Sequence, residues 1–322
     1  MTVRENSRAA LDGVPLPPLV AVVGPTAVGK SELAVRLCEA FAGEVLSADS
    51  RLVYRGMDIG TAKPSREKRM KVPHHLIDVT DIDRPWSLAL YRAQALGEIE
   101  EVLSRHHLPI LAGGTGQYVH AILEGWEIPR AAPDLQLRRE LERWGRSDGG
   151  RALHEELARR DPQAAASIDP RNVRRIIRAL EVVLRTGEPF SVLRTRAAVP
   201  FRSLQVGLTM PRKELYARAD RRIDEMLEQG WVQEVRDLMD RGFSPELPAF
   251  SALGYGQIVR HLRGGMTLEE CVVMIRQATR RLIRHQANWF RLDDPEIHWI
   301  QAGPPAFEEA SRLVAKFLAG TE

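Results

Sequence analysis

The sequence predicts an α/β protein, in which helices flank a parallel sheet and a small all-helical insertion interrupts it. An apolar run at Leu19–Val23 precedes a glycine-rich loop and a helical pattern. Short apolar runs and helical patterns then alternate as far as about residue 127. Strand signals are missing from 128 to 199 and return at Ser203–Leu208. Alternation of this kind is typical of a doubly wound parallel sheet.

The loop after the first apolar run has the spacing G-x-x-x-x-G-K-S of a phosphate-binding loop. Its glycines allow backbone N–H groups to turn toward an anion, and the following helix adds partial positive charge at its first turn. We expect Lys30 to supply a charge and Ser31 a hydroxyl for Mg²⁺. The fold is therefore expected to be P-loop NTPase-like, with a diphosphate group held by Gly24, Pro25, Thr26, Ala27, Val28, Gly29, Lys30 and Ser31.

Two further strands are predicted to end at the same edge of the sheet as this loop. Glu44–Ser50 is an apolar run that carries Asp49 near its end, and Leu108–Ala112 precedes the glycine-rich turn Gly113–Gly116. Ligands of open α/β sheets bind where the strands end, which places Asp49 near the phosphate-binding loop. The alternative is that Asp49 only caps the next turn.

The region between these strands gives weaker signals. Val72–Val79 resembles a strand, and its Asp78 resembles a Walker B aspartate, which would hold Mg²⁺. His74 and His75 are expected to form hydrogen bonds rather than bind a metal, because no further ligands lie at a suitable spacing. The loop Gly56–Pro64 offers Lys63 to an anion.

We divide the chain into three parts. Residues 1–18 are a polar, proline-rich stretch expected to be a flexible leader. Residues 19–127 and 200–322 form the predicted catalytic core, and 128–199 the helical insertion. Within the insertion, helices are expected at 134–144, 151–160 and 171–185, the last starting from Asp169-Pro170.

Arginines line two predicted helices. The formal net charge is only +3, so their distribution carries more information than their number. One stripe lies on the insertion and another on a late helix, whose other face is expected to be apolar. Solvated surface is the plain alternative, but two separate stripes favour a polyanionic partner such as RNA. The stripe positions are Arg171, Arg174, Arg175, Arg178 and Arg185, then Arg276, Arg280 and Arg284.

Composition excludes several classes of protein. With 44% hydrophobic residues a sizeable core is expected, and no apolar run approaches the length of a membrane span. Two cysteines, Cys38 and Cys271, are too few for a disulfide framework or a zinc site. We expect a cytoplasmic monomer without a membrane partner.

Several motifs follow one another in a fixed order. They are the phosphate-binding loop, Asp49-Ser50 with Tyr54, Gly56–Pro64, 73–78, 113–116 with Tyr118, 178–182, Gly254-Tyr255, and Gln286 with Trp289 and Arg291. Taken in order, these motifs resemble one family, the bacterial tRNA dimethylallyltransferases, or tRNA isopentenyltransferases, of the IPP transferase family. The run Gly56–Pro64 is the most specific of them.

The resemblance implies transfer of a dimethylallyl group from dimethylallyl diphosphate to the exocyclic N6 amine of the adenosine next to the anticodon of a tRNA. The loop would then hold the leaving diphosphate, with Mg²⁺ at Ser31. Asp49 would accept the proton of the amine, Thr115 would orient the diphosphate or the base, and Arg218 would bind diphosphate.

The partners implied are the tRNA anticodon stem-loop and dimethylallyl diphosphate. The chain departs from the family pattern at Gln117, Ser251, Gly256, His285 and Asn288. The resemblance places RNA contacts at Asp49, Ser50, Arg51, Leu52, Thr115, Arg138, Arg174, Arg175, Arg178, Tyr255, Arg284, Gln286 and Arg291. The aromatic ring of Tyr255 is expected to stack.

Three other functions fit part of the sequence. A free-nucleotide isopentenyltransferase, acting on AMP or ATP, shares the core motifs but needs no helical insertion. A P-loop kinase or NTPase fits the loop alone, and a non-catalytic RNA-binding protein fits the arginine stripes alone.

Overall fold

The computed structural model describes residues 15–129 and 134–320. The predicted leader, 1–18, lies largely outside these ranges. The chain divides into two units, one comprising Met1–Leu123 and Val199–Glu322 and the other Glu124–Ala198. The interval 128–199 predicted for the insertion overlaps the second unit.

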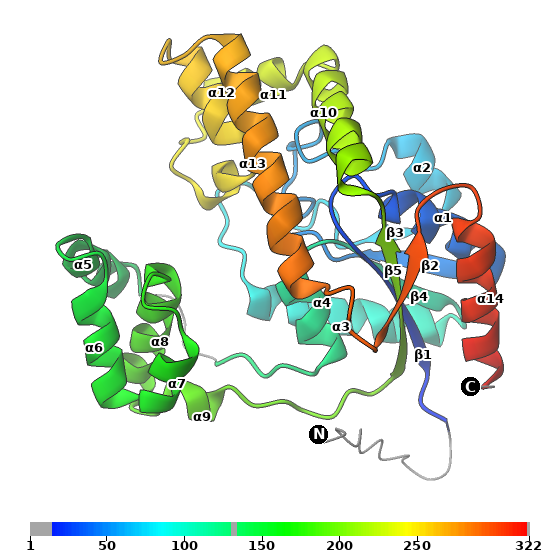
Figure 1. The fold of residues 1–322 in the computed structure, drawn as a ribbon, viewed down its shortest axis with the longest axis horizontal. Helices are drawn as coiled ribbons and strands as arrows, with labels where there is room; N and C mark the ends of the chain where they lie inside the picture. Colours follow the sequence, from blue (N-terminus) through cyan, green and yellow to red (C-terminus); the bar gives the residue numbers. More distant parts are fainter. Residues whose placement is uncertain (1–14, 130–133, 321–322) are drawn as a thin grey trace. The chain divides into compact units, whose positions relative to one another are not determined.

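The first unit is built on a six-stranded parallel sheet of order β3-β2-β4-β1-β5-β6 (Figure 1). Its strands are β1 (Pro18–Val23), β2 (Gly43–Ser47), β3 (His74–His75), β4 (Leu108–Ala112), β5 (Arg202–Thr209) and β6 (Ile297–Gln301). The predicted α/β class with a parallel sheet is confirmed. Strand β6 was not predicted from the sequence.

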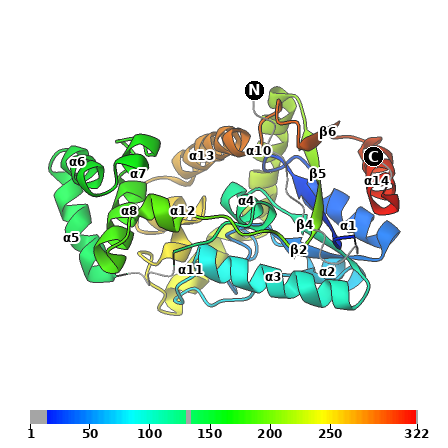
Figure 2. The ribbon, with the colours of Figure 1, turned by 90° about the horizontal axis from the view of Figure 1, so that it is seen from below.

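Helices cover both faces of this sheet. The helices of this unit are α1 (Lys30–Phe41), α2 (Arg66–Lys71), α3 (Leu88–Ser104), α4 (Gly116–Leu123), α10 (Arg212–Glu228), α11 (Trp231–Asp240), α12 (Tyr255–Leu262), α13 (Leu268–Trp289) and α14 (Ala306–Ala319), with a 3-10 turn at Pro248–Ser251. Helix α14 lies beside α1 (Figure 1), and α4 lies beside α3 (Figure 2).

The alternation of side chains along β1 separates two cores. Val20 and Val22 pack with α1, α10 and α14, whereas Leu19, Ala21 and Val23 pack with α3 and α4. Successive side chains of a strand point to opposite faces, so a wholly apolar strand is required when both faces are covered. A third core joins α11 and α12 to the segment that follows β2.

Strand β3 is much shorter than the predicted strand Val72–Val79. Leu76 and Asp78 have φ angles of 63° and 57°, in the left-handed region that a strand cannot contain. The apolar residues of this stretch suggest a longer strand, and nothing in their pattern indicates the turn.

The second unit is helical, with α5 (Leu135–Arg146), α6 (Arg151–Arg160), α7 (Pro162–Ser167), α8 (Val173–Thr186) and α9 (Phe190–Leu193) around its own core. Helix α8 is capped by Asn172, whose side chain accepts from the N–H of Arg175, and not by the predicted Asp169. An Asp-Pro pair does begin a helix at α7, where Asp161 is the N-cap and Pro162 is the first helical residue.

No helix within the described ranges is long and apolar enough to cross a membrane.

Glu44, at the start of β2, is a buried carboxylate whose stabilising contacts can be tested. It accepts hydrogen bonds from Arg105 Nε at 3.0 Å and from Arg105 Nη2 at 2.8 Å, and its other partners are His107 and His75. The hydrogen bonds from Arg105 are the main reason that the pKa of Glu44 is lowered to about 2.

We expect Glu44 to stabilise the fold above pH 4.5, its ordinary pKa, and to lose this contribution as the pH falls toward about 2. Glu44→Gln should lower the free energy of unfolding at pH 7 by roughly 3 kcal/mol and flatten its decline in acid. Urea unfolding at several pH values measures both, with Glu39→Gln on the exposed face of α1 as the control. Equal free energies of unfolding for the Glu44 variant and the unaltered protein would contradict the stabilising role of Glu44.

Candidate functional site

The phosphate-binding loop joins β1 to the first turn of α1. Gly24 and Gly29 have φ angles of 137° and 109°, which L side chains rarely adopt. A Cβ at residue 24 would lie 2.5 Å from the carbonyl oxygen of Leu208 on β5, so the close approach of these strands also requires glycine. The loop therefore takes a backbone conformation that aims amides and a helix N-terminus at one point.

Lys30 lies inside this loop. Its Nζ donates a hydrogen bond of 2.7 Å to the carbonyl oxygen of Pro25. Burial lowers the pKa of Lys30 to about 8, opposed by the negative charge of Asp49 and assisted by the positive charge of Arg222. An anion bound in the loop would raise this pKa again, because it favours the charged form.

Helix α10 adds two arginines to the same place. The Nη2 and Nη1 atoms of Arg218 lie 3.7 and 3.8 Å from the position that a Cβ of Gly29 would take, so the guanidinium lies against the loop. Arg222 follows one turn later, and its pKa is lowered by burial and by Arg218. Within the described chain neither arginine forms an ion pair, which leaves both for an anionic ligand.

Arg218 is a diphosphate ligand implied by the resemblance, whereas Arg222 is not among the site residues expected from the sequence. The i, i+4 spacing of the two arginines on one helix face was the signal available.

Asp49 follows β2 and lies at the same edge of the sheet. Its Oδ1 accepts a hydrogen bond of 2.8 Å from the N–H of Arg51, so it does cap the next turn. Its Oδ2 has no hydrogen-bond partner among the residues that the structure describes. Capping by one oxygen leaves the other for chemistry, and the two interpretations of Asp49 are compatible.

Thr115 fixes the backbone beside Asp49. Its Oγ1 accepts from the N–H of Ser50 at 3.0 Å, and its own N–H donates to the carbonyl oxygen of Ala48 at 3.1 Å. Gly113 allows this close packing, since a Cβ there would lie 2.2 Å from the same Ala48 oxygen. In this structure Thr115 therefore orients the segment that carries the acid.

A stacked aromatic pair supports the end of β2. The rings of Tyr91 and Tyr118 lie 3.7 Å apart at 15°, the hydroxyl of Tyr91 donates to the carbonyl oxygen of Ser47, and Trp86 donates to the hydroxyl of Tyr118. Burial, with a smaller contribution from the charge of Asp49, raises the pKa of both tyrosines. Both tyrosines remain neutral, and their stacked rings support the end of β2.

Gln286 is buried, which contradicts its prediction as an RNA contact. Its Oε1 accepts from the N–H of Thr26 at 2.7 Å, and its Nε2 donates to the carbonyl oxygen of Gly114 at 3.0 Å. The side-chain amide of Gln286, in the last turn of α13, therefore joins the phosphate-binding loop to the second glycine-rich turn instead of facing solvent.

The predicted stacking of Tyr255 on RNA is also contradicted. Its ring is fully buried, and its hydroxyl donates a hydrogen bond of 2.6 Å to Glu234 Oε1. Burial and the charge of Glu234 raise the pKa of Tyr255 well above its ordinary value, so the hydroxyl stays a donor.

Lys63 is not available to an anion as predicted. Its Nζ donates to the carbonyl oxygen of Tyr54 and to Asp58 Oδ1, both at 2.6 Å, and to Asp78 Oδ1 at 2.5 Å. Asp78 Oδ2 accepts from Arg69 at 2.8 Å, so both oxygens of the Walker B candidate are used in ion pairs. The structure therefore gives Asp78 a structural role.

Several arginines of the two stripes are paired within the protein. Arg276 and Arg280 of α13 bind Asp224 and Asp220 of α10, each at 2.5 Å. In the helical unit Arg178 binds the buried Glu181 at 2.6 Å. Outside the stripes, Arg138 binds the same carboxylate at 2.8 Å, and Arg291, which follows α13, binds Asp293 at 2.8 Å. Arg174, Arg175 and Arg284 are exposed.

The helical unit nevertheless carries the excess charge of the chain. Residues 124–198 contain 15 arginines, no lysine and 12 acidic residues, so their formal excess equals the +3 of the whole chain. The rest of the chain contains equal numbers of basic and acidic residues. A polyanion would be attracted chiefly by this unit.

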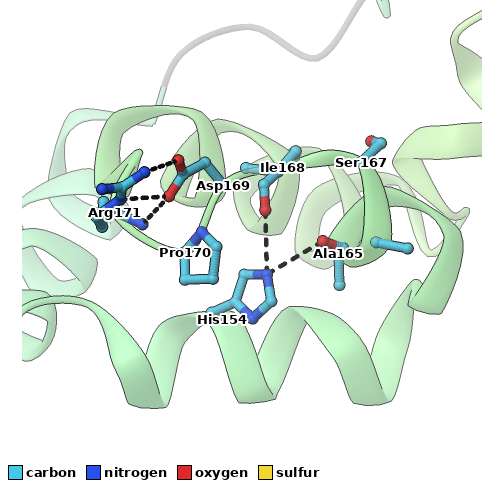
Figure 3. A pocket seen from close by; sticks show the side chains of 8 residues that line it. His154, Ala165, Ser167, Ile168, Asp169, Pro170 and Arg171 are labelled. Atoms are coloured by element: carbon cyan, nitrogen blue, oxygen red, sulfur yellow. Dashed lines mark hydrogen bonds and ion pairs between the residues drawn. The ribbon is translucent and has the colours of Figure 1, made fainter.

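A cavity of about 740 Å³ in the helical unit does not resemble a catalytic site (Figure 3). His154 Nε2 is within hydrogen-bond distance of the carbonyl oxygens of Ala165 and Ile168, and Asp169 binds Arg171 at 2.7 Å. Its polar side chains are thus engaged with one another or with the backbone.

The described residues contain no cluster of three or more histidine, cysteine or acidic side chains able to hold a metal ion. His74 Nδ1 is bonded to the carbonyl oxygen of Val72, and both ring nitrogens of His75 face carboxylates, as their predicted hydrogen-bonding role requires.

Comparisons with known proteins agree with this geometry. The model of the IPP transferase family matches residues 52–293. The chain is 50% identical over 295 residues to the tRNA dimethylallyltransferase of Thermomicrobium roseum, covering 92% of this chain and 89% of that protein. The corresponding enzyme of Dehalococcoides mccartyi is 43% identical, with coverage of 98% and 97%.

A solved structure is also similar. The full-length tRNA isopentenylpyrophosphate transferase of Bacillus halodurans superimposes with a TM-score of 0.69 at 40% identity, over 94% of this chain and 96% of that one.

The lowered pKa of Lys30 predicts how anion binding depends on pH. Below about pH 8 Lys30 is already charged in the free protein. Above that pH, Lys30 must take up a proton when the anion binds. The affinity for a diphosphate monoester should therefore fall by up to about tenfold per pH unit above this pKa. Calorimetry from about pH 7 to pH 9.5, in buffers of different ionisation enthalpy, measures both affinity and proton uptake. Lys213→Gln on the exposed face of α10 is the control. Constant affinity without proton uptake would show that Lys30 does not contact the anion.

Proposed function

The chain belongs to the IPP transferase family, and from this premise we propose that it transfers a dimethylallyl group from dimethylallyl diphosphate to N6 of the adenosine next to the tRNA anticodon. The observation that carries the proposal is the charge arrangement at one sheet edge. Lys30, Arg218 and Arg222 lie at an anion-binding loop, and the carboxylate of Asp49 is within electrostatic reach of Lys30 and Arg222.

The diphosphate of the donor is proposed to bind the loop from Gly24 to Ser31. In the reaction the allylic C–O bond breaks and its electron pair leaves with the diphosphate, where negative charge increases. Backbone amides, Lys30 and the two arginines of α10 stabilise this charge in positions fixed before the reaction. Their benefit is greatest in the transition state, which is what accelerates the step.

The acceptor amine forms the new N–C bond and loses a proton. Its lone pair is delocalised into the adenine ring, so it is a weak nucleophile. Asp49 Oδ2 is proposed to accept the proton, while Oδ1 stays bonded to the N–H of Arg51. Thr115 acts by holding Ser50, and with it the orientation of the acid.

Mg²⁺ fits this site as an ion carried largely by the diphosphate. Ser31 is exposed at the first turn of α1, and Mg²⁺ commonly takes few protein ligands beside phosphate oxygens and water. When bound, Mg²⁺ would neutralise charge on the leaving diphosphate.

The acceptor is proposed to be RNA in the form of the anticodon stem-loop, bound by a monomer. The charge excess of the helical unit supports a polyanionic acceptor over a free nucleotide. The residues proposed to contact the tRNA are Asp49, Ser50, Arg51, Leu52, Thr115, Arg138, Arg174, Arg175, Arg178, Arg284 and Arg291.

Labelled dimethylallyl diphosphate with unmodified tRNA and Mg²⁺ tests the function. One adenosine per tRNA should be labelled, and Asp49→Asn should lower kcat by about a hundredfold or more, because a general base contributes roughly 10²–10⁴. Binding of donor should not weaken, because the substitution removes a negative charge near the diphosphate site. Preferred transfer to AMP would favour the free-nucleotide enzyme, and phosphate release from ATP without transfer would favour a kinase or NTPase. Activity insensitive to Asp49→Asn would remove its catalytic role.

Arg222 supplies a second test with a matched neighbour. Arg222→Gln should weaken donor binding about tenfold or more, since a charge-assisted contact in a poorly hydrated site is lost. Arg221→Gln, one residue away on the exposed side of α10, should leave donor affinity unchanged. Equal affinities for the two variants would exclude Arg222 from the diphosphate site.

A further inference from the structure

The loop Gly56–Pro64 is the most specific motif of the sequence, yet the proposed chemistry uses none of its residues. The structure shows that its backbone binds a carboxylate from α11. Glu234 Oε2 accepts from the N–H groups of Asp58 and Ile59 at 2.7 Å each, and Oε1 accepts from that of Gly60 at 3.1 Å. Three successive amides thus form an anion-binding nest around one side chain.

The same face of α11 holds a second segment. Trp231, one turn before Glu234, lies between two glycines: a Cβ on Gly60 would come within 1.9 Å of its ring, and a Cβ on Gly254 within 2.0 Å. Tyr255, next to Gly254, donates its hydroxyl to Glu234 Oε1 at 2.6 Å. One carboxylate therefore ties the motif loop to the turn that begins α12.

Both segments are connected to the loop that carries Asp49. Lys63, whose side chain is 2% exposed, donates to the carbonyl oxygen of Tyr54 and so fixes the end of the 49–54 segment. Arg51 Nη1 donates to the carbonyl oxygen of Pro248, in the turn that precedes Tyr255. Of the predicted RNA contacts, Arg51 is one of these two attachments, Leu52 lies between them and Ser50 directly precedes them.

We propose that Glu234 is a positioning residue for the RNA acceptor. By holding the motif loop and the α12 turn together, it sets the geometry of the 49–54 segment against which the acceptor must dock. It makes no hydrogen bond to the phosphate-binding loop, so it acts on acceptor binding and not on donor binding. This inference rests on the proposed function, since it requires an RNA acceptor at that segment.

Both carboxylate oxygens of Glu234 are needed to accept its four hydrogen bonds. A glutamine has one acceptor oxygen, and its amide NH₂ would face backbone N–H donors or the hydroxyl of Tyr255. Glu234→Gln therefore keeps the size of the side chain but cannot satisfy all four donors. Asp237, on the exposed side of α11, offers a matched control in Asp237→Asn, because its only described partner is Gln233.

The experiment measures steady-state transfer to tRNA together with the Kd of dimethylallyl diphosphate. For Glu234→Gln the KM for tRNA should rise about tenfold or more while the Kd of the donor stays within about twofold. Tyr255→Phe removes one of the four hydrogen bonds and should raise the KM for tRNA about threefold. The double variant should resemble Glu234→Gln alone, because the two residues share one interaction.

The outcomes separate this inference from the proposed function. No transfer by the unaltered protein would reject the function itself. Transfer by the unaltered protein, with the KM for tRNA of Glu234→Gln equal to that of Asp237→Asn, would overturn the role of Glu234, as would an equal loss of donor and acceptor binding. If Glu234→Gln does not fold, an unchanged KM for tRNA in Tyr255→Phe would overturn it instead.

Discussion

The candidate site depends on an excess of positive charge gathered around one loop. Lys30, Arg218 and Arg222 converge on the phosphate-binding loop, and the negative charge of Asp49 acts on Lys30 and Arg222. Burying cations without equal compensation costs free energy, and the lowered pKa values of Lys30 and Arg222 are the sign of that cost. A multivalent anion offsets it, so the free protein already contains the electrostatic conditions for holding a diphosphate.

Arginines in this chain serve two different purposes, and only coordinates separate them. Arg276 and Arg280 join α13 to α10 through aspartates. These pairs are part of the architecture. A helical stripe that suggests a polyanion-binding face therefore consists partly of arginines in ion pairs between helices. The net positive charge of residues 124–198 is not affected by this pairing.

The sequence predicted most reliably what short-range chemistry determines. Strand β1, the glycine spacing and the start of α1 follow from local conformational rules, and the resemblance located Asp49 and Arg218. It failed at some local turns and caps, and where distant segments decide. Left-handed Leu76 and Asp78 end β3 early, and Asn172 displaces Asp169 as a cap. Gln286 and Tyr255 find partners far away in the chain. Whether a polar side chain faces RNA or the interior depends on tertiary contacts that no motif records.

The hydrogen bond between Gln286 and the N–H of Thr26 has a thermodynamic consequence. One amide of the phosphate-binding loop is already occupied by a side chain from the end of α13. An anion that claims this amide must release Gln286, and any displacement of the final turn of α13 makes the amide available. Linkage is reciprocal, so occupancy of the loop and the arrangement of that helical turn bias each other by the same free energy. The donor site and the C-terminal helices are in this sense a single coupled element.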